Sequence, residues 1–293
     1  MPAVTKTTAV PIKRPTVKSG DVWDRVKNVG FDADAGIKVM LYGRSGTGKT
    51  NLWGTFPGPI LAVICSGGKK PGELRTLDTP ENRKGRIKEV ALENSQELVT
   101  LANGAVSHGF KTIVIDHVTG FQDLVLGEII GKPVPEQKSW GIAAQQDYAQ
   151  CALQCKEKLR HMLDLDINVV LIGQERENDK PEQSELIQPS VGVATTPSLA
   201  GWLNTAVDYI AHTFIRDAVE TTQQKVGNTT VAMKKPKLTK QGIQAVEYCL
   251  RTAPSATYMT KFRTPKGTGD KGIIVDPSYD KIMAAIRGES ASE

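Results

Sequence analysis

The sequence lacks the features that would place it in a membrane or in an oxidising compartment. Its 293 residues contain no run of about 18 apolar residues, which argues against a transmembrane helix and against a membrane partner. No apolar signal-peptide core is present near the N-terminus. The cysteines form neither a C-x-x-C pair nor a cysteine–histidine cluster with zinc spacing; they are Cys65, Cys151, Cys155 and Cys249. We therefore expect buried, reduced thiols and a cytoplasmic location.

Aromatic residues are scarce throughout, and acidic residues are absent from the beginning of the chain. Aromatics make up 5% of the residues, so few side chains are available for stacking on nucleobases. Residues 1–20 contain Lys6, Lys13, Arg14 and Lys18 but no acid, and we expect them to form a disordered basic tail. The net charge of +5 is a mild excess, which is compatible with a polyanionic partner but does not establish one.

One segment of eight residues fits a specific phosphate-binding pattern, G-x-x-x-x-G-K-[ST]. It reads Gly43-Arg44-Ser45-Gly46-Thr47-Gly48-Lys49-Thr50. Residues 38–42 read as a buried strand before this P-loop, and Asn51 continues a helix after it. The glycines let backbone N–H groups form an anion nest, to which the helix adds its positive dipole end. We expect residues 43–51 to bind a nucleotide, with Lys49 on the β- and γ-phosphates and Thr50 on Mg²⁺.

From residue 37 onward, apolar segments alternate with segments of helical pattern. The predicted strands cover residues 60–65, 86–92, 111–116 and 168–174, and the predicted helices cover 95–107, 121–130 and 142–164. Strands this apolar are typical of a parallel sheet with helices on both faces. We therefore expect an α/β fold with a mostly parallel central sheet.

The pattern changes after about residue 205, where strands follow one another without helices. These strands are predicted at residues 207–219, 243–252 and 256–263, with a basic hairpin-like or loose segment at 234–240. We expect an antiparallel extension over 205–265 and a closing helix over 277–287. A single domain is expected over 21–288, beginning with a short helix at 21–29 and followed by a tail at 289–293.

Polar residues at the ends of predicted strands are expected to complete the nucleotide site. Asp116 follows Ile113-Val114-Ile115, and a carboxylate on a strand beside the P-loop strand can hold the water shell of Mg²⁺. The alternative is an Asp that caps the next turn. Gln174 ends the following strand and is expected near the γ-phosphate, unless it simply faces solvent.

The group that orients the attacking water is the least defined part of the predicted site. Its expected place is the end of the strand at residues 60–65, where no acid follows directly. Glu73 is the nearest carboxylate, although it also fits an ordinary surface residue. His117 is a weaker candidate, because a histidine at a strand end commonly makes only local hydrogen bonds.

The P-loop, the strand ending in Asp116 and the strand ending in Gln174 together resemble the RecA-like ATPase core. The closest resemblance is to short, core-only bacteriophage proteins that are labelled AAA-type and implicated in single-strand annealing and recombination. It covers roughly residues 35–285. The resemblance implies Mg²⁺-dependent ATP hydrolysis and, if the protein is phage-encoded, a location in the bacterial host cytosol.

RecA-like proteins assemble into filaments or rings with ATP between neighbours, so the resemblance also implies self-association. Lys261 and Arg263 lie two apart on a predicted strand and hence on one face. They look like the pair that reaches the γ-phosphate of the next subunit, as an arginine finger does. The alternative is two solvated basic residues. The chain has no clear strand-end catalytic Glu, so hydrolysis is expected to be slow.

Single-stranded DNA is the partner that the resemblance implies, together with a single-strand DNA-binding protein. RecA-like proteins use two loops for DNA, which correspond here to residues 131–140, with Trp140, and to a long loop at 175–201. The second loop is not basic. Lysines and arginines concentrate instead between residues 225 and 271, where they either follow a nucleic-acid backbone or are simply solvated.

The predicted function is therefore an ATP-dependent recombinase or annealing protein that binds single-stranded DNA. One alternative is a P-loop DNA motor of the helicase or packaging type. Another is a nucleotide-gated DNA-binding scaffold with little turnover, which the missing strand-end Glu favours. A nucleotide kinase is a further alternative, but the chain shows no arginine-rich lid.

Overall fold

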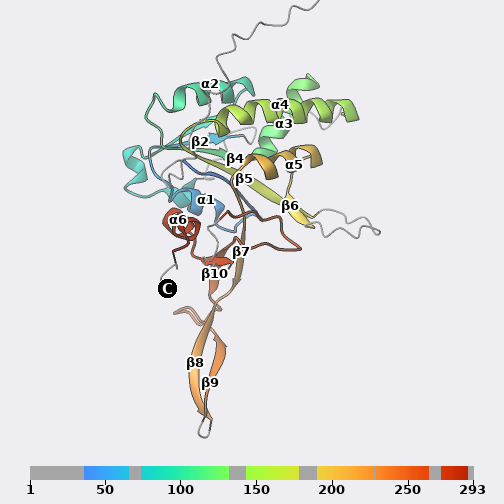
Figure 1. The fold of residues 1–293 in the computed structure, drawn as a ribbon. Helices are drawn as coiled ribbons and strands as arrows, with labels where there is room; N and C mark the ends of the chain where they lie inside the picture. The colour runs from blue at the N-terminus through green and yellow to red at the C-terminus, as the bar shows by residue number, and fades with distance from the viewer. Residues whose placement is uncertain are drawn as a thin grey trace, which may run out of the picture. The chain divides into compact units, whose positions relative to one another are not determined.

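The computed structural model describes residues 36–65, 74–131, 143–177, 190–226, 229–263 and 272–289, excluding the side chains of 222–226 and 229–234. These residues form a large sheet covered by helices and a small two-stranded sheet (Figure 1). The tail predicted over residues 1–20 and the helix predicted over 21–29 lie outside the described residues. Of the predicted tail at 289–293, only Glu289 is described.

The large sheet is built around the strand that leads into the P-loop. This strand, β1 (Lys38–Gly43), is buried except at its first residue. It lies between two parallel neighbours, β5 (Asn168–Glu177) and β7 (Tyr209–Asp217). Beyond β5 the sheet continues with the parallel strands β4 (Thr112–Asp116), β2 (Ile60–Ile64) and β3 (Ile87–Ala91). The parallel region predicted from the apolar segments is confirmed.

The predicted antiparallel extension is also present, although one of its strands is not. Strand β10 (Val246–Arg251) pairs antiparallel with β7, and β11 (Ile273–Val275) pairs antiparallel with β10. The strand predicted over residues 256–263 is wrong. That segment makes only isolated bridges, from Tyr258 to Val191 and from Lys261 to Ile210.

A two-stranded ribbon follows β7, where the sequence predicted only a hairpin-like or loose segment at residues 234–240. It consists of β8 (Val219–Val226) and β9 (Thr229–Pro236), which pair only with each other (Figure 1). The sequence of β8, VETTQQKV, lacks the alternation of apolar and polar residues that marks a half-buried strand. Of the hairpin-like and loose alternatives for residues 234–240, the hairpin-like one holds for residues 234–236, which end a paired strand.

The long loop predicted over residues 175–201 is also wrong in its described parts. Strand β5 continues as far as Glu177, and β6 (Val191–Val193) pairs antiparallel with that continuation. Helix α5 then begins at Pro197 and ends at Ala206. Residues 178–189 lie outside the described residues.

Helices cover both faces of the large sheet and divide its core into two parts. One face carries α2 (Gln96–Ala105), α3 (Val118–Ile129), α4 (Gln145–Leu163) and α5. Their buried side chains and one face of the strands form what we call the α4-side core. The other face carries α1 (Lys49–Trp53) and α6 (Tyr279–Arg287), which form the α1-side core. The main predicted helices are thus confirmed within a few residues.

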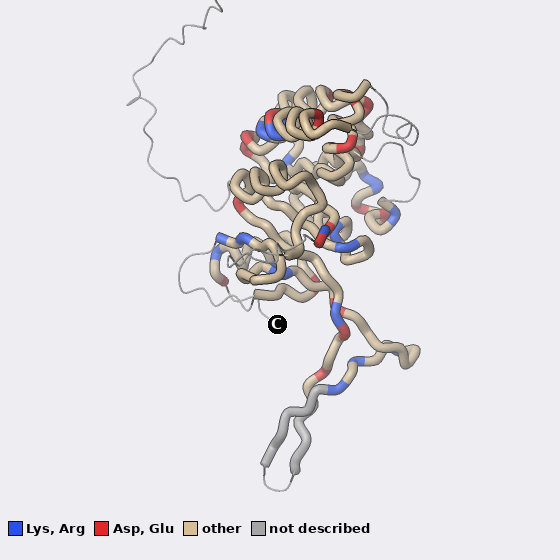
Figure 2. Tube along the Cα trace, turned by 90° about the vertical axis from the view of Figure 1, so that its right-hand side faces the viewer, with Lys and Arg blue, Asp and Glu red and all other residues tan. Residues whose placement is uncertain are grey.

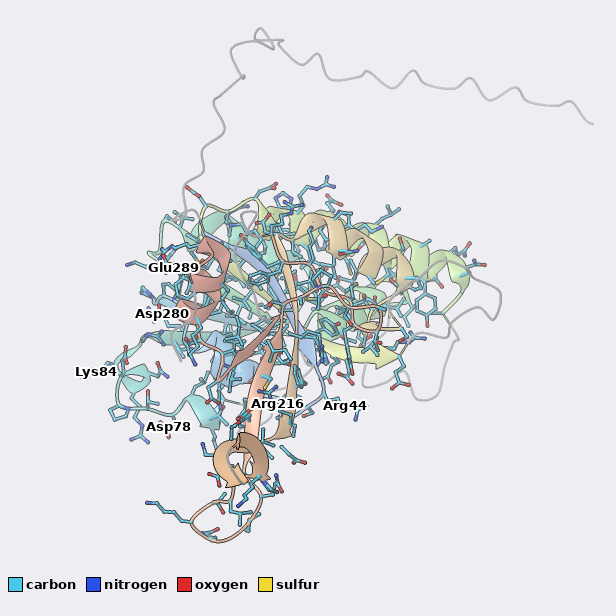
Figure 3. All side chains as sticks on the ribbon, turned by 60° about the horizontal axis from the view of Figure 1, so that its bottom comes forward. Arg44, Asp78, Lys84, Arg216, Asp280 and Glu289 are labelled. Carbon is cyan, nitrogen blue, oxygen red and sulfur yellow. The ribbon has the colours of Figure 1, made fainter. Side chains whose placement is uncertain are left out.

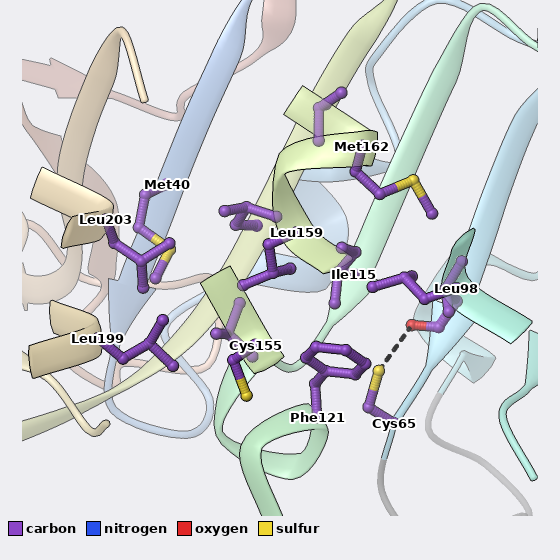
Figure 4. Packing of buried hydrophobic residues seen from close by; sticks show 14 of the residues in the cluster. Met40, Cys65, Leu98, Ile115, Phe121, Cys155, Leu159, Met162, Leu199 and Leu203 are labelled. Atoms are coloured by element: carbon purple, nitrogen blue, oxygen red, sulfur yellow. Dashed lines mark hydrogen bonds between the residues drawn. The ribbon is translucent and has the colours of Figure 1, made fainter. Parts of the chain in front are cut away.

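Helix α4 shows why a sparse apolar pattern is enough to build this core. Cys155, Leu159 and Met162 are fully buried, and their spacing of four and three residues places them on one helix face. They pack over Met40 of β1 and Ile115 of β4 in the α4-side core (Figure 4). Among the described helices, none is long and apolar enough to cross a membrane.

Candidate nucleotide site

The P-loop has the backbone that its glycines predict. Gly46 and Gly48 both have φ values of +83°, in the left-handed region that favours glycine. At Gly43, an added Cβ would lie 2.3 Å from the carbonyl oxygen of Thr213, so any larger side chain would collide with β7. The helix that follows, α1, has only five residues. Anion binding must therefore rely on the loop N–H groups and Lys49 more than on a helix dipole.

The P-loop is fastened to β7 by a pair of threonines. The Oγ1 atoms of Thr47 and Thr213 lie 2.7 Å apart, and Thr213 also donates to the carbonyl oxygen of Tyr42 at 3.2 Å. Since Thr213 donates to Tyr42, the single hydroxyl proton of Thr47 is shared between the Oγ1 of Thr213 and the carbonyl oxygen of Arg44, which lies 2.8 Å away. These bonds hold the loop closed over the end of β1. Sequence reasoning missed Thr213, because nothing in the sequence indicated that β7 pairs with β1.

Lys49 lies inside the loop, as the motif predicts. Its Nζ donates to the carbonyl oxygens of Gly43 and Arg44, both at 2.7 Å. Burial lowers the pKa of Lys49, while the nearby carboxylates of Asp116 and Glu175 oppose this shift. A poorly solvated ammonium group held at the centre of an anion nest is suited to binding phosphate.

The structure places Asp116 and Gln174 at the edge of the sheet where the P-loop begins. Gln174 is paired with Gly43, and Asp116 is paired with Ile172. Side chains alternate along a strand. Since Val114 and Ile172 lie in the α1-side core, Asp116 and Gln174 share that face of the sheet with α1. Lys49, Thr50, Asp116 and Gln174 therefore occupy the same edge and the same face.

One detail of the prediction is wrong: the strand that ends in Asp116 is not beside the P-loop strand. Strand β5 lies between β4 and β1, and it brings Gln174 closer to the loop than Asp116. Asp116 nevertheless lies near enough to Lys49 to influence its pKa. Strand order is set by tertiary pairing, so no local pattern in the sequence could have revealed it.

The oxygen atoms of Thr50 and Asp116 are of the type that Mg²⁺ prefers. The described residues contain no group of three or more His, Cys, Asp or Glu side chains that could hold a metal by themselves. Mg²⁺ does not require such a group, because it is commonly bound through one or two carboxylates and the phosphates of a nucleotide. Thr50 and Asp116 would hold the ion, which would neutralise charge on the phosphates.

Sequence reasoning missed Glu175, which joins the P-loop to β7. Its carboxylate accepts from the Nε of Arg44 at 2.7 Å and from the Nε2 of His212 at 3.0 Å. The side chain of Glu175 is 13% exposed, whereas that of Arg44 is 74% exposed. Burial alone raises the pKa of Glu175, but hydrogen bonds from His212 and Arg44 outweigh it and hold the pKa below its ordinary value.

His212 lies in a stack of rings on the α4 side of the sheet. Its ring centroid lies 4.3 Å from that of Tyr258 and 5.8 Å from that of Phe214. The guanidinium of Arg251 packs over these same two rings. Burial lowers the pKa of His212, against the effect of Glu175, so the ring is neutral at pH 7. With Nδ1 unpartnered, Nε2 carries the proton that His212 donates to Glu175.

Lys261 and Arg263 lie away from the P-loop of their own chain. The Nζ of Lys261 donates to the carbonyl oxygens of Asn204 and Val207, at 2.8 and 2.6 Å, around the end of α5. Arg263 lies 3.7 Å from Asp208, and its side chain is 65% exposed. Lys261 thus has a structural role at the end of α5, while the guanidinium of Arg263 is open to solvent.

Other predicted residues are either local in role or outside the described part. The Nδ1 of His117 accepts from the backbone N–H of Gly120 at 2.9 Å and caps α3. Glu73, the predicted water-orienting residue, and Trp140 of the first predicted DNA loop lie outside the described residues. The remaining loop residues, Ser45 and Arg44, are exposed, and Asn51 lies exposed on α1.

The basic residues between 225 and 271 do not gather on one described surface. Lys235, Lys237 and Lys240 are exposed at the base of the ribbon, whereas Arg251 is packed between rings and Lys261 binds carbonyls. Figure 2 shows Lys and Arg interspersed with Asp and Glu along the described chain. In Figure 3, Arg44 and Arg216 both lie near the P-loop end of the sheet. Each of them is paired with a glutamate.

The mostly parallel sheet, the P-loop at the end of β1 and the acid at the end of β4 define a P-loop nucleotide-binding α/β protein. Comparison with protein families agrees with this class, because the model of an AAA domain matches residues 35–264. The chain belongs to this AAA domain family, whose members are P-loop ATPases. A search of curated proteins found no match.

Proposed function

We propose that the protein is a Mg²⁺-dependent ATPase whose nucleotide cycle controls binding to single-stranded DNA. The observation that carries the nucleotide part is the convergence of the P-loop, Lys49, Asp116 and Gln174 on one edge of the sheet. Lys49 would neutralise the phosphates, Asp116 would hold the metal through water, and Gln174 would contact the γ-phosphate. Membership of the AAA domain family supports the same chemistry.

The finer part of the proposal is a RecA-like recombinase or annealing protein of the kind found in bacteriophages. Its support is the resemblance of the motifs and the strands that carry them. In this proposal, copies of the chain assemble on DNA with ATP between them, and hydrolysis releases the DNA. The mixed charge of the described surface gives this part no electrostatic support of its own (Figure 2).

A nucleotide-gated scaffold is the second candidate, and one observation favours it. Strand β2 ends at Ile64, and in the sequence Cys65, Ser66 and Gly67 follow, so no carboxylate comes directly after this strand. Without a residue that orients water, bound ATP would persist and act as a structural signal. Slow turnover with tight ATP binding would identify this case.

The deciding experiment is steady-state ATP hydrolysis at low salt over a range of protein concentrations, with and without single-stranded DNA. We expect DNA to stimulate turnover, and turnover to rise more than linearly with protein concentration. Lys49→Ala should abolish turnover because it removes the cation in the loop. Normal ATP binding and hydrolysis in that variant would disprove the assigned site. Tight binding without turnover in the wild type would support the scaffold.

A further inference from the structure

A tyrosine ring lies directly beside the P-loop, and the phosphate-binding role of the loop does not account for it. Tyr248 of β10 lies across Gly48, at the start of α1. Its Cδ1, Cε1 and Cγ atoms lie 3.0, 3.5 and 3.7 Å from the position that a Cβ on Gly48 would occupy. The residue is nevertheless 41% exposed, so part of the ring faces solvent.

This ring belongs to an apolar surface that continues outward from the core beneath α1. Along β10, Leu250 is fully buried in the α1-side core, and Tyr248 and Val246 follow it on the same face. Ile215 of β7 is paired directly with Tyr248 and therefore shares that face. Ile215 is 50% exposed and Val246 is 51% exposed. The apolar face thus emerges from the core into solvent beside the P-loop.

A nucleotide needs such a surface as well as a P-loop. The P-loop contacts only the phosphates, whereas the base is flat, aromatic and gains by leaving water for an aromatic surface. Among the described residues, the large exposed aromatics are Tyr248 and Tyr148. Tyr148 lies on α4, on the other face of the sheet. Tyr248 is therefore the described aromatic that is both exposed and next to the phosphate nest.

We propose that Tyr248, supported by Ile215, forms the subsite that stacks on the base of a nucleoside triphosphate bound at the P-loop. This inference rests on the proposed function, because it assumes that the P-loop binds the triphosphate. Stacking on one face of a ring does not read the hydrogen-bonding edge of a base. The subsite thus adds affinity for any nucleoside triphosphate over its bare phosphates, with a preference for the larger purines.

The test compares ATP with inorganic tripolyphosphate, which has the phosphates but no base. Binding of each to the full chain is measured by calorimetry in the presence of Mg²⁺. Tyr248→Ala should weaken ATP binding about tenfold and leave tripolyphosphate binding unchanged. Tyr248→Phe keeps the ring and should bind ATP like the wild type. Tyr148→Ala removes an equally exposed tyrosine and should change neither affinity, so it serves as the matched control.

Failure of this inference can be told apart from failure of the proposed function. If Lys49→Ala abolishes binding of both ligands while Tyr248→Ala retains normal ATP affinity, the P-loop assignment stands and the base subsite is overturned. An equal loss of both ligands in Tyr248→Ala would also overturn it, because the ring would then only support the loop. If Lys49→Ala leaves both affinities unchanged, the proposed function itself fails.

Two further outcomes are covered by additional measurements. If Tyr248→Ala does not fold, as judged by circular dichroism, Tyr248→Leu keeps apolar volume without the ring and must show the same selective loss of ATP affinity. Sedimentation of Tyr248→Ala tests whether the apolar surface instead contacts a second copy. A changed oligomeric state with unchanged ATP affinity would overturn the subsite.

Discussion

At the scale of single residues, the contacts of Glu175 matter as much as the P-loop motif. Its carboxylate, which is 13% exposed, connects the side chain of Arg44 to the ring of His212. Arg44 is a variable position of the motif, so the pattern alone gave it no specific role. Because Glu175 is nearly buried, its two hydrogen bonds are shielded from water and should contribute more than a surface ion pair does.

We predict that Glu175→Gln lowers the free energy of unfolding by about 1.5–3 kcal/mol at pH 7, the range for hydrogen bonds to charged groups. The folded-state pKa of Glu175 is depressed, so this contribution is present above its ordinary value of 4.5 and is lost as pH falls through the folded pKa. The difference between variant and wild type should therefore vanish in acid. Urea unfolding at several pH values measures it.

The matched control for this prediction is Glu247→Gln. Glu247 accepts from Arg216 at 2.9 Å, and its side chain is 22% exposed, against 13% for Glu175. Its substitution should change stability by less than about 1 kcal/mol. Equal losses in both variants, or a Glu175→Gln effect that persists in acid, would contradict the special role of Glu175.

At the scale of elements, the site depends on which strands lie beside β1. Strand β5 supplies Gln174, and β7 supplies Thr213. We predict that Thr213→Val, which keeps the shape but removes the hydroxyl, destabilises the fold by about 1 kcal/mol. The hydroxyl of Thr47 would lose this partner, so ATP affinity should fall as well, as calorimetry can measure.

The control for Thr213→Val is the same substitution at a threonine outside the site. Thr252 is unsuitable for this purpose, because it makes contacts of its own. Thr205→Val is better, since Thr205 is exposed near the end of α5 and its hydroxyl donates to the carbonyl of Trp202. It should leave ATP affinity unchanged. Wild-type ATP affinity in Thr213→Val would show that the loop keeps its shape without this tie to β7.

The sequence predicted elements well where burial sets the pattern of apolar residues. It predicted them poorly where only the pairing of strands defines the element. Residues 60–64 and 113–115 are apolar and buried on both faces of the sheet, so their strands could be predicted. The ribbon of β8 and β9 pairs only with itself, and its polar residues leave no periodic signal. The positions of Glu175, Thr213 and Tyr248 around the P-loop depend on strand order, which a single sequence does not encode locally.

At the scale of the whole molecule, we propose that copies of the chain share their nucleotide sites. Arg263 remains the predicted finger, and its side chain is 65% exposed beside Asp208. We predict that Arg263→Ala binds ATP normally but loses at least about a thousandfold in turnover. Turnover with single-stranded DNA and calorimetry with ATP measure the two effects separately.

Mixing experiments provide the control. Lys49→Ala and Arg263→Ala should each be inactive alone, whereas a mixture should regain turnover, because some interfaces then combine an intact P-loop with an intact Arg263. Lys261→Ala is not equivalent, since Lys261 binds the carbonyls at the end of α5 and its loss should mainly lower stability. Unchanged turnover in Arg263→Ala, or no recovery in the mixture, would exclude action between subunits.

Strand β5 changes partners between two consecutive residues. Up to Gln174 it pairs with β1, and from Glu175 it pairs with β6. Gln174 shares a face with α1, while Glu175 contacts His212 on the opposite face. The peptide unit between Gln174 and Glu175 thus carries one side chain on the face of the nucleotide site and the other on the face of the stacked rings. Any rotation of that unit moves both side chains at once, so the two faces cannot rearrange independently at this point.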